Sequence, residues 1–507
     1  MIHSEDGSSS TTLPRLSKSK YLAGLQCHKR LYLEVHHPER ATPPDPATQA
    51  VLDMGTEIGI HARGLFPGGV LINEGHRQRD EALARTASVM ADPSVTAVFE
   101  GAFHHDGVFV RADILERDAG PDGTPRSWRL IEVKSSSRVK DVHLDDLAIQ
   151  SAVLEGAGLL LSAVCLMHID TEYVYEGGSV DWRRLFTIED VTAAVANRRI
   201  EVPERIAAMK ALLLAPVPPA VEPGRQCHSP YECPFWNHCT QNKPDRWIYY
   251  LPGSKDVAER LVDRGVSIID DIPADVPLSP AQRRVKENVE WISPGLRDAL
   301  RSIRYPVHHV DFETVMLAVP RFPSTRPYQS IPVQWSNHIE EEPGCLTHRE
   351  FLHVEPTEPR KRWAEALIES LGREGSICVY SSYEEAMMRQ LVEAFPEFRS
   401  AFQPILKRLW DLHEVIKQHY YHPRFNGSYS IKSVLPAVVP SLGYGDLTIQ
   451  SGGQAAAEYY RMVFVETDWI EQAAIRSALL QYCARDTLAL VELRRTLQKK
   501  MEATNGS

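Results

Sequence analysis

The chain has 507 residues, a formal net charge of −11, and 43% hydrophobic and 24% charged residues. This length exceeds the usual limit of one hydrophobic core, so we expect two or three domains. The negative charge excludes a general attraction to phosphate backbones, so nucleic-acid contacts must come from local basic clusters. The apolar stretch 159–169 is too short to span a bilayer, and the start MIHSEDGSSS lacks the order of a signal peptide. We therefore expect a cytoplasmic protein.

The first half of the sequence alternates between helical and strand patterns. Residues 1–17 are rich in Ser and Thr and predict a disordered tail. Apolar periodicity then predicts the following elements: helices over 20–34 and 54–66, two strands within 98–117, a strand over 128–134, a helix over 145–155 and a strand over 159–169. This order predicts an α/β sheet with one face free for a site.

Two carboxylates and an ammonium group are predicted to meet on this sheet. Asp113 ends one strand, and Glu132 and Lys134 lie two residues apart on the next, so the pleat places both on one face. Carboxylates can hold Mg²⁺ or Mn²⁺, and lysine can orient the water that attacks a phosphodiester. By itself this D…ExK pattern is common on solvated strands.

The stretch IEVKSSSRVKDVHLDDLAIQSAVLEGAG resembles the RecB-type branch of the PD-(D/E)XK nucleases. The resemblance implies a restriction-endonuclease-like fold in which the helix after the ExK strand contributes a glutamine, here Gln150. It also implies a metal-binding histidine on an upstream helix, for which His61 is the candidate. A surface or packing role is the alternative for His61.

Four of the eight cysteines follow a ligand pattern. Cys227, Cys233 and Cys239 crowd together, and Cys27 lies far upstream. This bracketing resembles the iron–sulfur RecB-type and AddB-type nucleases and implies a structural 4Fe-4S cluster that joins both ends of the domain. Zinc, with His228 and His238 as further ligands, is the alternative, although both gaps of five residues exceed the usual zinc spacing. The remaining cysteines are predicted to be small buried hydrophobes: Cys165, Cys345, Cys378 and Cys483.

A proline-rich connector, APVPPAVEPG, leads into the cysteine cluster. After it, SKDVAERLVDRG predicts a helix that Gly265 closes, and further short helices run to Ser302. We interpret residues 241–303 as a helical spacer. A weak likeness to a helix-hairpin-helix DNA-binding element exists there.

The second half begins with VHHVDFE, in which Asp311 and Glu313 lie two residues apart on a strand. Near the C-terminus, YCARDT places Tyr482 and Asp486 one helical turn apart. These motifs resemble the first and third motifs of tyrosine-bearing DEDD exonucleases on a ribonuclease H-like fold. The resemblance implies two divalent ions held by carboxylates and a tyrosine that positions water.

The second DEDD motif departs from its usual form. In VYSSYEE, Tyr380 stands where an asparagine is usual, and Glu384 occupies the acidic position. Asp411 is the alternative metal ligand. The loop HPRFNGSYSIKSVLP adds Arg424 and Lys432 as candidate nucleic-acid contacts, with an ordinary solvated loop as the alternative.

The whole order resembles a family of bacterial two-nuclease proteins. We therefore expect a PD-(D/E)XK domain over 18–240, the spacer over 241–303 and a DEDDy-like 3′-5′ exonuclease domain over 304–507. The predicted function is metal-dependent hydrolysis of single-stranded or end-containing DNA in repair or defence. The alternatives are an RNA-processing exonuclease with a nucleic-acid-binding N-terminal domain, and a catalytically decayed nucleic-acid-binding adaptor.

Overall fold

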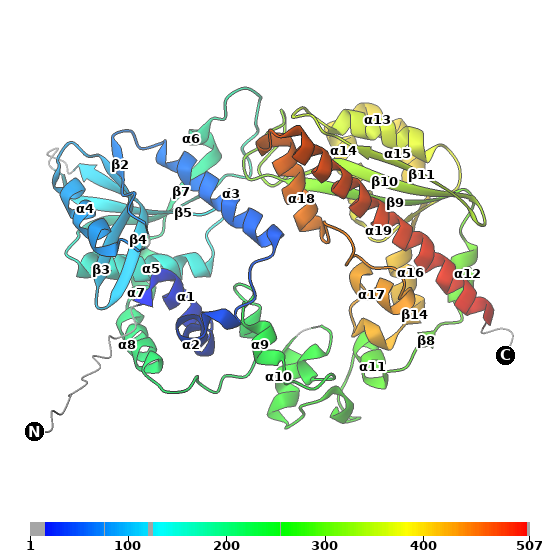
Figure 1. The fold of residues 1–507 in the computed structure, drawn as a ribbon, viewed down its shortest axis with the longest axis horizontal. Coiled ribbons are helices and arrows are strands. Elements are labelled where there is room, and N and C mark those ends of the chain that lie inside the picture. The colour runs from blue at the N-terminus through cyan, green and yellow to red at the C-terminus, as the bar shows by residue number, and fades with distance from the viewer. Residues whose placement is uncertain (1–15, 76, 120–124, 254, 504–507) are drawn as a thin grey trace, which may run out of the picture. The chain divides into compact units, whose positions relative to one another are not determined.

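The computed structural model describes residues 16–75, 77–119, 125–253 and 255–503, and its chain forms two compact units (Figure 1). The first unit comprises the described residues of Met1–Pro44, Val51–Val174 and Gly178–Asn242, and the second comprises those of Asp45–Ala50, Tyr175–Gly177 and Lys243–Ser507. Each unit combines helices with a mixed sheet. The predicted α/β class is therefore confirmed.

A seven-stranded sheet forms the centre of the first unit, in the order β2-β3-β4-β5-β6-β7 with β1 beside β4. Its strands are β1 (Leu16–Ser17), β2 (Gly69–Leu71), β3 (Ala97–His105), β4 (Val108–Ala119), β5 (Pro125–Val133), β6 (Leu161–Ile169) and β7 (Phe186–Asp190). β3, β4 and β5 are consecutive antiparallel neighbours, whereas β5 and β6 are parallel. A parallel pair needs a crossover, and the helix α5 provides it.

The helices of the first unit are α1 (Lys18–Gln26), α2 (His28–His36), α3 (Pro46–Arg63), α4 (Arg79–Ala91), α5 (Asp141–Gly156), α6 (Trp182–Leu185), α7 (Thr192–Arg199), α8 (Val202–Leu213) and α9 (Trp236–Thr240). α5 is buried along most of its length, and Leu147 and Val153 pack with Val110 and Leu130 of the sheet in the core. This packing fixes the polar residues of α5 relative to β5.

Two predictions for the start of the chain need correction. The expected single helix over 20–34 breaks at Cys27, whose backbone is extended (φ −162°, ψ 123°) and separates α1 from α2. Of the expected disordered tail 1–17, Leu16 and Ser17 form β1, and Leu16 is buried in the core. Residues 1–15 lie outside the described residues.

The second unit has a five-stranded sheet in the order β11-β10-β9-β12-β13. Its strands are β9 (Val307–Met316), β10 (Ser330–Glu342), β11 (Cys345–Leu352), β12 (Ser376–Val379) and β13 (Leu409–Asp411). The first three strands are antiparallel, and β12 runs parallel to both β9 and β13. The strand with the first acidic motif is therefore central.

Helices cover both faces of this sheet (Figure 1). They are α13 (Arg360–Leu371), α14 (Tyr383–Ala394), α15 (Arg399–Leu406), α16 (Leu412–His419), α17 (Ile431–Val438), α18 (Gly452–Tyr460) and α19 (Trp469–Ala503). On one face, Val310 and Phe312 pack in a core with Trp363 of α13. On the other, Val315 packs with Leu479 of α19. The pleat therefore turns the odd-numbered residues of β9 towards α19.

Of the predicted spacer, residues 243–303 lie within the second unit, where short helices alternate with irregular segments. It contains α10 (Lys255–Asp263), α11 (Pro280–Glu287), α12 (Leu296–Arg301) and the short strand β8 (Trp291–Ile292). Gly265 follows α10 with a positive φ of 82°, as expected of the residue that closes a helix. β8 pairs with β14 (Tyr420–Tyr421), so the spacer is joined to the second sheet's domain by backbone hydrogen bonds.

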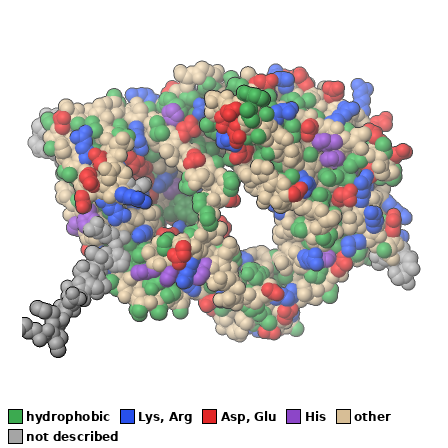
Figure 2. All heavy atoms as spheres, viewed as in Figure 1, with side chains coloured by type: hydrophobic (Ala, Val, Ile, Leu, Met, Phe, Trp, Pro, Cys, Tyr) green, Lys and Arg blue, Asp and Glu red, His purple; other side chains and the backbone are tan. Residues whose placement is uncertain are grey.

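The surfaces of both units mix acidic and basic side chains on the face that Figure 2 shows. This agrees with the overall negative charge, which predicts no general attraction to phosphate. Within the described ranges, every helix is too short or too polar to span a lipid bilayer.

Candidate active sites

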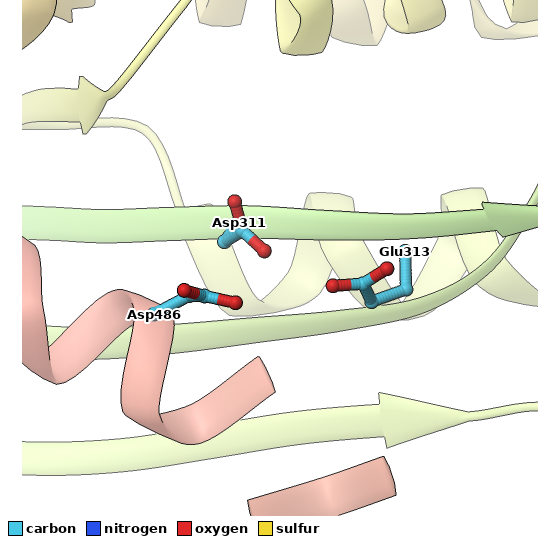
Figure 3. Close-up of side chains that lie close together, drawn as sticks. All are labelled: Asp311, Glu313 and Asp486. Atoms are coloured by element: carbon cyan, nitrogen blue, oxygen red, sulfur yellow. The ribbon is translucent and has the colours of Figure 1, made fainter. Parts of the chain in front are cut away.

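Three carboxylates of the second unit converge on the α19 side of the sheet. Asp311 and Glu313 project from β9, and Asp486 projects from α19 (Figure 3). One carboxylate oxygen of each residue lies within 4.8 Å of the others. In the described ranges, this is the one group of three or more acidic, histidine or cysteine side chains close enough to share a metal ion. Hard oxygen donors of this kind suit Mg²⁺ or Mn²⁺.

Burial perturbs all three carboxyl groups, and repulsion by acidic neighbours adds to this effect at Asp311 and Glu313. The pKa of Asp311 is well above its usual value because the group is buried and lies near Asp486 and Glu313. Burial, followed by the charge of Asp486, raises the pKa of Glu313 to about 8. Burial raises the pKa of Asp486 to about 6, against the opposing effect of nearby hydrogen bonds. Such a set of carboxyl groups favours an added cation, which would offset the repulsion.

Two tyrosines surround Asp486. The Tyr444 hydroxyl donates a hydrogen bond to Oδ1 of Asp486. Tyr482, one helical turn before Asp486, also lowers the pKa of that carboxyl by hydrogen bonding, and the two tyrosine rings lie 6.1 Å apart. Burial next to these carboxylates raises the pKa of both phenols far above the usual value, so both stay protonated donors.

Of the two predicted basic contacts, Lys432 contributes to this site, but it lies in the first turn of α17 and not in the predicted loop. The Lys432 ammonium lowers the pKa of both Glu313 and Asp486, donates a hydrogen bond of 2.7 Å to the Gln450 carbonyl and lies 5.7 Å from the Tyr444 ring centre. Arg424 is an exposed residue whose backbone N–H donates to His422. Its role as a nucleic-acid contact stays a prediction.

Glu384 lies beside the three carboxylates, whereas Asp411 caps a helix. Glu384 is buried, raises the pKa of Asp311 and Glu313, and accepts a hydrogen bond of 3.2 Å from Ser381. Its oxygens are not within 4.8 Å of all three partners. Asp411 caps α16 by accepting the backbone N–H groups of His413 and Glu414. Glu384 is therefore better placed than Asp411 as the fourth acidic residue.

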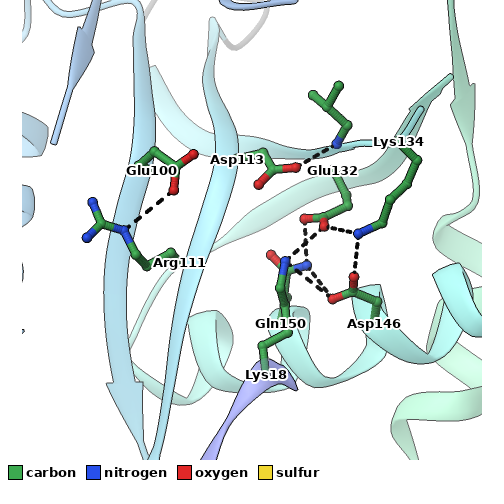
Figure 4. Close-up of polar contacts among 9 residues, drawn as sticks. Lys18, Glu100, Arg111, Asp113, Glu132, Lys134, Asp146 and Gln150 are labelled. Carbon is green, nitrogen blue, oxygen red and sulfur yellow. Dashed lines mark hydrogen bonds and ion pairs between the residues drawn. The ribbon is translucent and has the colours of Figure 1, made fainter. Parts of the chain in front are cut away.

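In the first unit, β5 and α5 form a polar network around Glu132 (Figure 4). Oε1 of Glu132 accepts hydrogen bonds from Lys134 at 2.6 Å and from Lys18 of α1 at 2.8 Å. Oε2 accepts a hydrogen bond of 2.7 Å from Gln150. Asp146 of α5 accepts from Lys134 at 2.8 Å and from Gln150 at 2.9 Å. The predicted residues Lys134 and Gln150 therefore both contact Glu132 directly.

Asp113 lies on β4 next to this network. Its Oδ2 accepts a hydrogen bond of 2.8 Å from the backbone N–H of Val133. Burial, followed by the charge of Glu132, raises the pKa of Asp113 to about 7. Burial alone would raise the pKa of Glu132 as well, but the lysines Lys134 and Lys18 lower it below its usual value. Glu132 is therefore ionised near neutral pH, and Asp113 titrates there.

His61 lies on α3, where its ring stacks on Trp182 with centres 3.7 Å apart. Its Nε2 also lies 3.8 Å from Glu57. These contacts match the packing role that the sequence left open, and its role as a metal ligand stays a prediction.

All four predicted cysteine ligands line one small cavity, together with Arg30, Phe235 and Trp236. The side chain of Gln26, beside Cys27, holds the later segment by donating to the carbonyls of Gln226 at 2.7 Å and Tyr231 at 2.6 Å. Burial raises the pKa of Cys233 to about 11. This thiol is therefore protonated at neutral pH unless a metal replaces the proton.

The spacing of the thiols bears on which metal they could hold. In a tetrahedral zinc site with bonds of about 2.3 Å, sulfur atoms lie about 3.8 Å from one another. No three sulfurs of the described cysteines lie within 4.8 Å of one another. His228 pairs with Glu232 at 2.7 Å, and His238 faces Arg40 at 3.4 Å. The four thiols therefore surround a cavity without forming a single-ion site, and the 4Fe-4S assignment stays a prediction.

The other cysteines are buried with one exception. Cys165, Cys378 and Cys483 are buried as predicted, but Cys345 is exposed because it begins the edge strand β11. The sulfur of Cys483 lies 3.9 Å from Oδ2 of Asp311, so this cysteine packs directly against the acidic site.

Three contributors to the sites were not predicted. Asp146 had a detectable signal, because it lies one helical turn before Gln150 and therefore on the same face of α5. No signal in the sequence marked Lys18 or Tyr444, because each comes from a segment distant in sequence and reaches its carboxylate only through tertiary packing.

Comparison with protein families gives a match in the second unit. A family model described as "Domain of unknown function (DUF2779)" matches residues 308–430. The matched segment contains Asp311, Glu313 and Glu384 but ends before Lys432 and Asp486. No curated protein matches the chain. The match therefore marks the part of the second unit that carries the first acidic motif, and it assigns no activity.

Proposed function

We propose that this protein is a metal-dependent nuclease whose second unit is a DEDDy-like 3′-5′ exonuclease. The observation that carries the proposal is the convergence of Asp311, Glu313 and Asp486 within 4.8 Å, on the central strand and the long helix of one unit. The strand order β11-β10-β9-β12-β13, with the first strand central, supports a ribonuclease H-like fold. Tyr482 beside Asp486 supports the tyrosine-bearing subgroup.

The carboxylates Asp311, Glu313 and Asp486, with Glu384 beside them, would hold Mg²⁺ or Mn²⁺. When bound, the ions would lower the pKa of water and stabilise charge on the phosphate. Tyr444 orients Asp486 through its hydrogen bond, and the protonated hydroxyl of Tyr482 is available to orient water. The Lys432 ammonium, which acts electrostatically on Glu313 and Asp486, is placed to attract a phosphate oxygen.

We propose a second nuclease site of the PD-(D/E)XK type around Asp113, Glu132 and Lys134. The antiparallel strands β3, β4 and β5, followed by α5 and the parallel strand β6, support this assignment. Divalent ions held by Asp113 and Glu132 would compete with Lys18, which donates to Glu132 Oε1. The adjacent Lys134 is the candidate for orienting water.

The proposed substrate is DNA that is single-stranded or has a free end, in repair or defence. RNA is the alternative substrate, because metal ions held by the carboxylates would act on the phosphodiester, which DNA and RNA share. A decayed adaptor is disfavoured, because the described carboxylates of both sites are retained and lie near their proposed partners.

The test uses full-length protein with labelled single-stranded DNA, duplex DNA and RNA, each with Mg²⁺, Mn²⁺ or EDTA. We expect metal-dependent release of mononucleotides from 3′ ends, and a loss of at least about 100-fold in Asp311→Asn, since even a partner of a metal ligand contributes about 10–100-fold. The Glu132→Gln variant measures how much of the cleavage depends on the proposed PD-(D/E)XK site. Cleavage of RNA alone would reject the DNA assignment, and activity that persists in Asp311→Asn, Glu132→Gln and the double variant would reject both sites.

We further propose that Cys27, Cys227, Cys233 and Cys239 ligate a 4Fe-4S cluster with a structural role. The position of all four cysteines around one small cavity supports this assignment. Anaerobically purified protein is expected to be brown and to contain about four irons per chain. A colourless protein with one zinc would contradict the proposal.

A further inference from the structure

A cavity of about 510 Å³ lies in the second unit, away from the acidic residues. It is lined by α12, the chain between α12 and β9, and the last turns of α19. Its polar and aromatic lining includes Arg297, Arg301, Tyr305, Arg494, Gln498 and Glu502. The volume is within the range of roughly 300–1,000 Å³ that is typical of small-molecule sites.

The wall of this cavity is rich in guanidinium groups. Arg297 and Arg301 lie one turn apart on α12, and in the part of the chain that the structure describes neither forms an ion pair with a carboxylate. Figure 2 shows basic side chains gathered near the C-terminal end of the chain. Glu502 is the acidic residue of the lining. The lining therefore contains two guanidinium groups that have no ion-pair partner among the described residues, and one carboxylate.

A third guanidinium group forms the base of the site. Arg494 is fully buried and pairs with Glu340, and its Nε donates a hydrogen bond of 3.1 Å to His309. Its guanidinium carbon lies 5.9 Å from the centre of the Tyr305 ring. Its Nη1 also donates to the Gln498 side chain at 3.2 Å. These contacts fix the position of Arg494, so this wall is rigid before a ligand binds.

The lining also offers an aromatic surface. Tyr305 is 38% exposed and belongs to the cavity wall. An exposed tyrosine ring stacks on nucleobases without regard to sequence. Arginine recognises phosphate by paired hydrogen bonds, with a geometry that lysine lacks. The combination of guanidinium groups without an ion-pair partner in the described part of the chain, an aromatic ring and a cavity of this volume matches one nucleotide better than a bare anion or an apolar ligand.

We propose that this cavity binds a single nucleotide through its phosphate and base, supplied either as the phosphorylated end of a nucleic-acid strand or as a free nucleotide. Arg297 and Arg301 hold the phosphate, and Tyr305 stacks on the base. Glu502 at the wall opposes an anion and limits the affinity. The proposal does not rest on the nuclease activity, because binding here requires none of the acidic residues.

The test measures binding of adenosine 5′-monophosphate to the full chain by calorimetry in EDTA, which keeps metal from the acidic sites. Arg297→Gln/Arg301→Gln is expected to weaken binding by at least about tenfold, since hydrogen bonds to charged groups are lost. Glu502→Gln is expected to tighten it. The matched control is Arg304→Gln/Arg373→Gln, which removes the same charge from exposed residues outside the cavity and should leave binding unchanged.

Further ligands identify what the site recognises. Inorganic phosphate and adenosine should each bind at least about tenfold more weakly than the monophosphate, because each lacks one of the two recognised groups. A 5′-phosphorylated oligonucleotide that binds more tightly than its 5′-hydroxyl form identifies a strand end as the source. Binding of the monophosphate without this difference identifies a free nucleotide.

The proposal is overturned if the monophosphate binds equally to wild type and to Arg297→Gln/Arg301→Gln, if it does not bind at all, or if inorganic phosphate binds as tightly. The Asp311→Asn variant separates this result from the proposed nuclease function. It should lose cleavage and still bind the monophosphate in EDTA.

Discussion

At the acidic site, the Tyr444 hydroxyl donates to Asp486 and so fixes the orientation of a proposed metal ligand. Hydrogen-bond partners of metal ligands contribute substantially to metal affinity and activity. Tyr444 is therefore a positioning residue, because it acts through Asp486.

The Tyr444→Phe substitution tests this role. We expect nuclease activity to fall by about 10–100-fold, with a higher metal concentration needed for half-maximal activity, because Asp486 loses its partner. The matched control is Tyr459→Phe, since the buried Tyr459 hydroxyl has no hydrogen-bond partner among the residues that the structure describes. Equal activity and equal metal dependence in the two variants would contradict the role.

The buried carboxylates also predict how stability depends on pH. The pKa of Glu313 is raised from 4.5 to about 8, so folded protein keeps a proton that unfolded protein has released at neutral pH. The free energy of unfolding of metal-free protein should therefore fall as pH rises through 8. Metal ions bind the deprotonated carboxylates. The gain in the free energy of unfolding on adding metal should therefore become larger as pH rises through 8.

Thermal unfolding at pH 7 and pH 8.5, in EDTA and in Mg²⁺, measures this effect. Both pH values lie above the range in which the buried histidines titrate. We expect the metal-induced rise in Tm to be larger at pH 8.5. Asp311→Asn removes a repelling neighbour and should make Tm in EDTA less dependent on pH. A metal effect that is the same at both pH values would reject the linkage.

At the scale of elements, β9 positions the acidic site of the second unit because the two faces of this strand serve different purposes. Val310 and Phe312 anchor the strand in the core beneath α13, so Asp311 and Glu313 must face α19. The start of the parallel partner β12 is fixed by Gly375, whose φ is +81° and whose position leaves no room for a side chain.

We expect Gly375→Ala to destabilise the second unit strongly. A Cβ atom there would lie 1.9 Å from the Pro306 carbonyl oxygen, so the turn before β12 would have to move. The control is Gly344→Ala, which has a similar φ of +91° but nothing within 4 Å of the added atom. Denaturant unfolding should give a loss of about 1–2 kcal/mol for the control and clearly more for Gly375→Ala. Equal losses would contradict the steric explanation.

For the whole molecule, each unit has its own core and its own polar site. The cysteine cavity joins α2 to the segment around α9, which are the beginning and the end of the first unit. A cluster held there would stabilise the folded first unit, because it closes a long loop of chain.

Cys227→Ser should therefore bleach the protein and lower the unfolding temperature of the first unit by at least about 5 °C, the equivalent of one to two kcal/mol for a unit of this size. The control, Cys345→Ser, changes an exposed cysteine outside the cavity and should alter neither property. Limited proteolysis locates the destabilised region. An unchanged colour and melting profile in Cys227→Ser would contradict the cluster.

Local patterns in the sequence were sufficient for much of this architecture. The α/β class follows from the alternation of periodicities, and pairs such as Glu132 with Lys134 and Asp311 with Glu313 share a face because side chains alternate along a strand. The break of the first helix at Cys27 was missed, because the apolar spacing continues across a residue whose backbone is extended.

Tertiary structure decided which distant groups meet. Lys18 reaches Glu132 across 114 residues, and Tyr444 reaches Asp486 across 42, without any local pattern that marks either partner. The arginine-lined cavity likewise depends on α12 lying against the end of α19. Periodicity in the sequence indicates the face of a helix or strand on which a side chain lies. Which segments contact each other depends on how these faces pack in the folded chain, and no local pattern in a single sequence shows this.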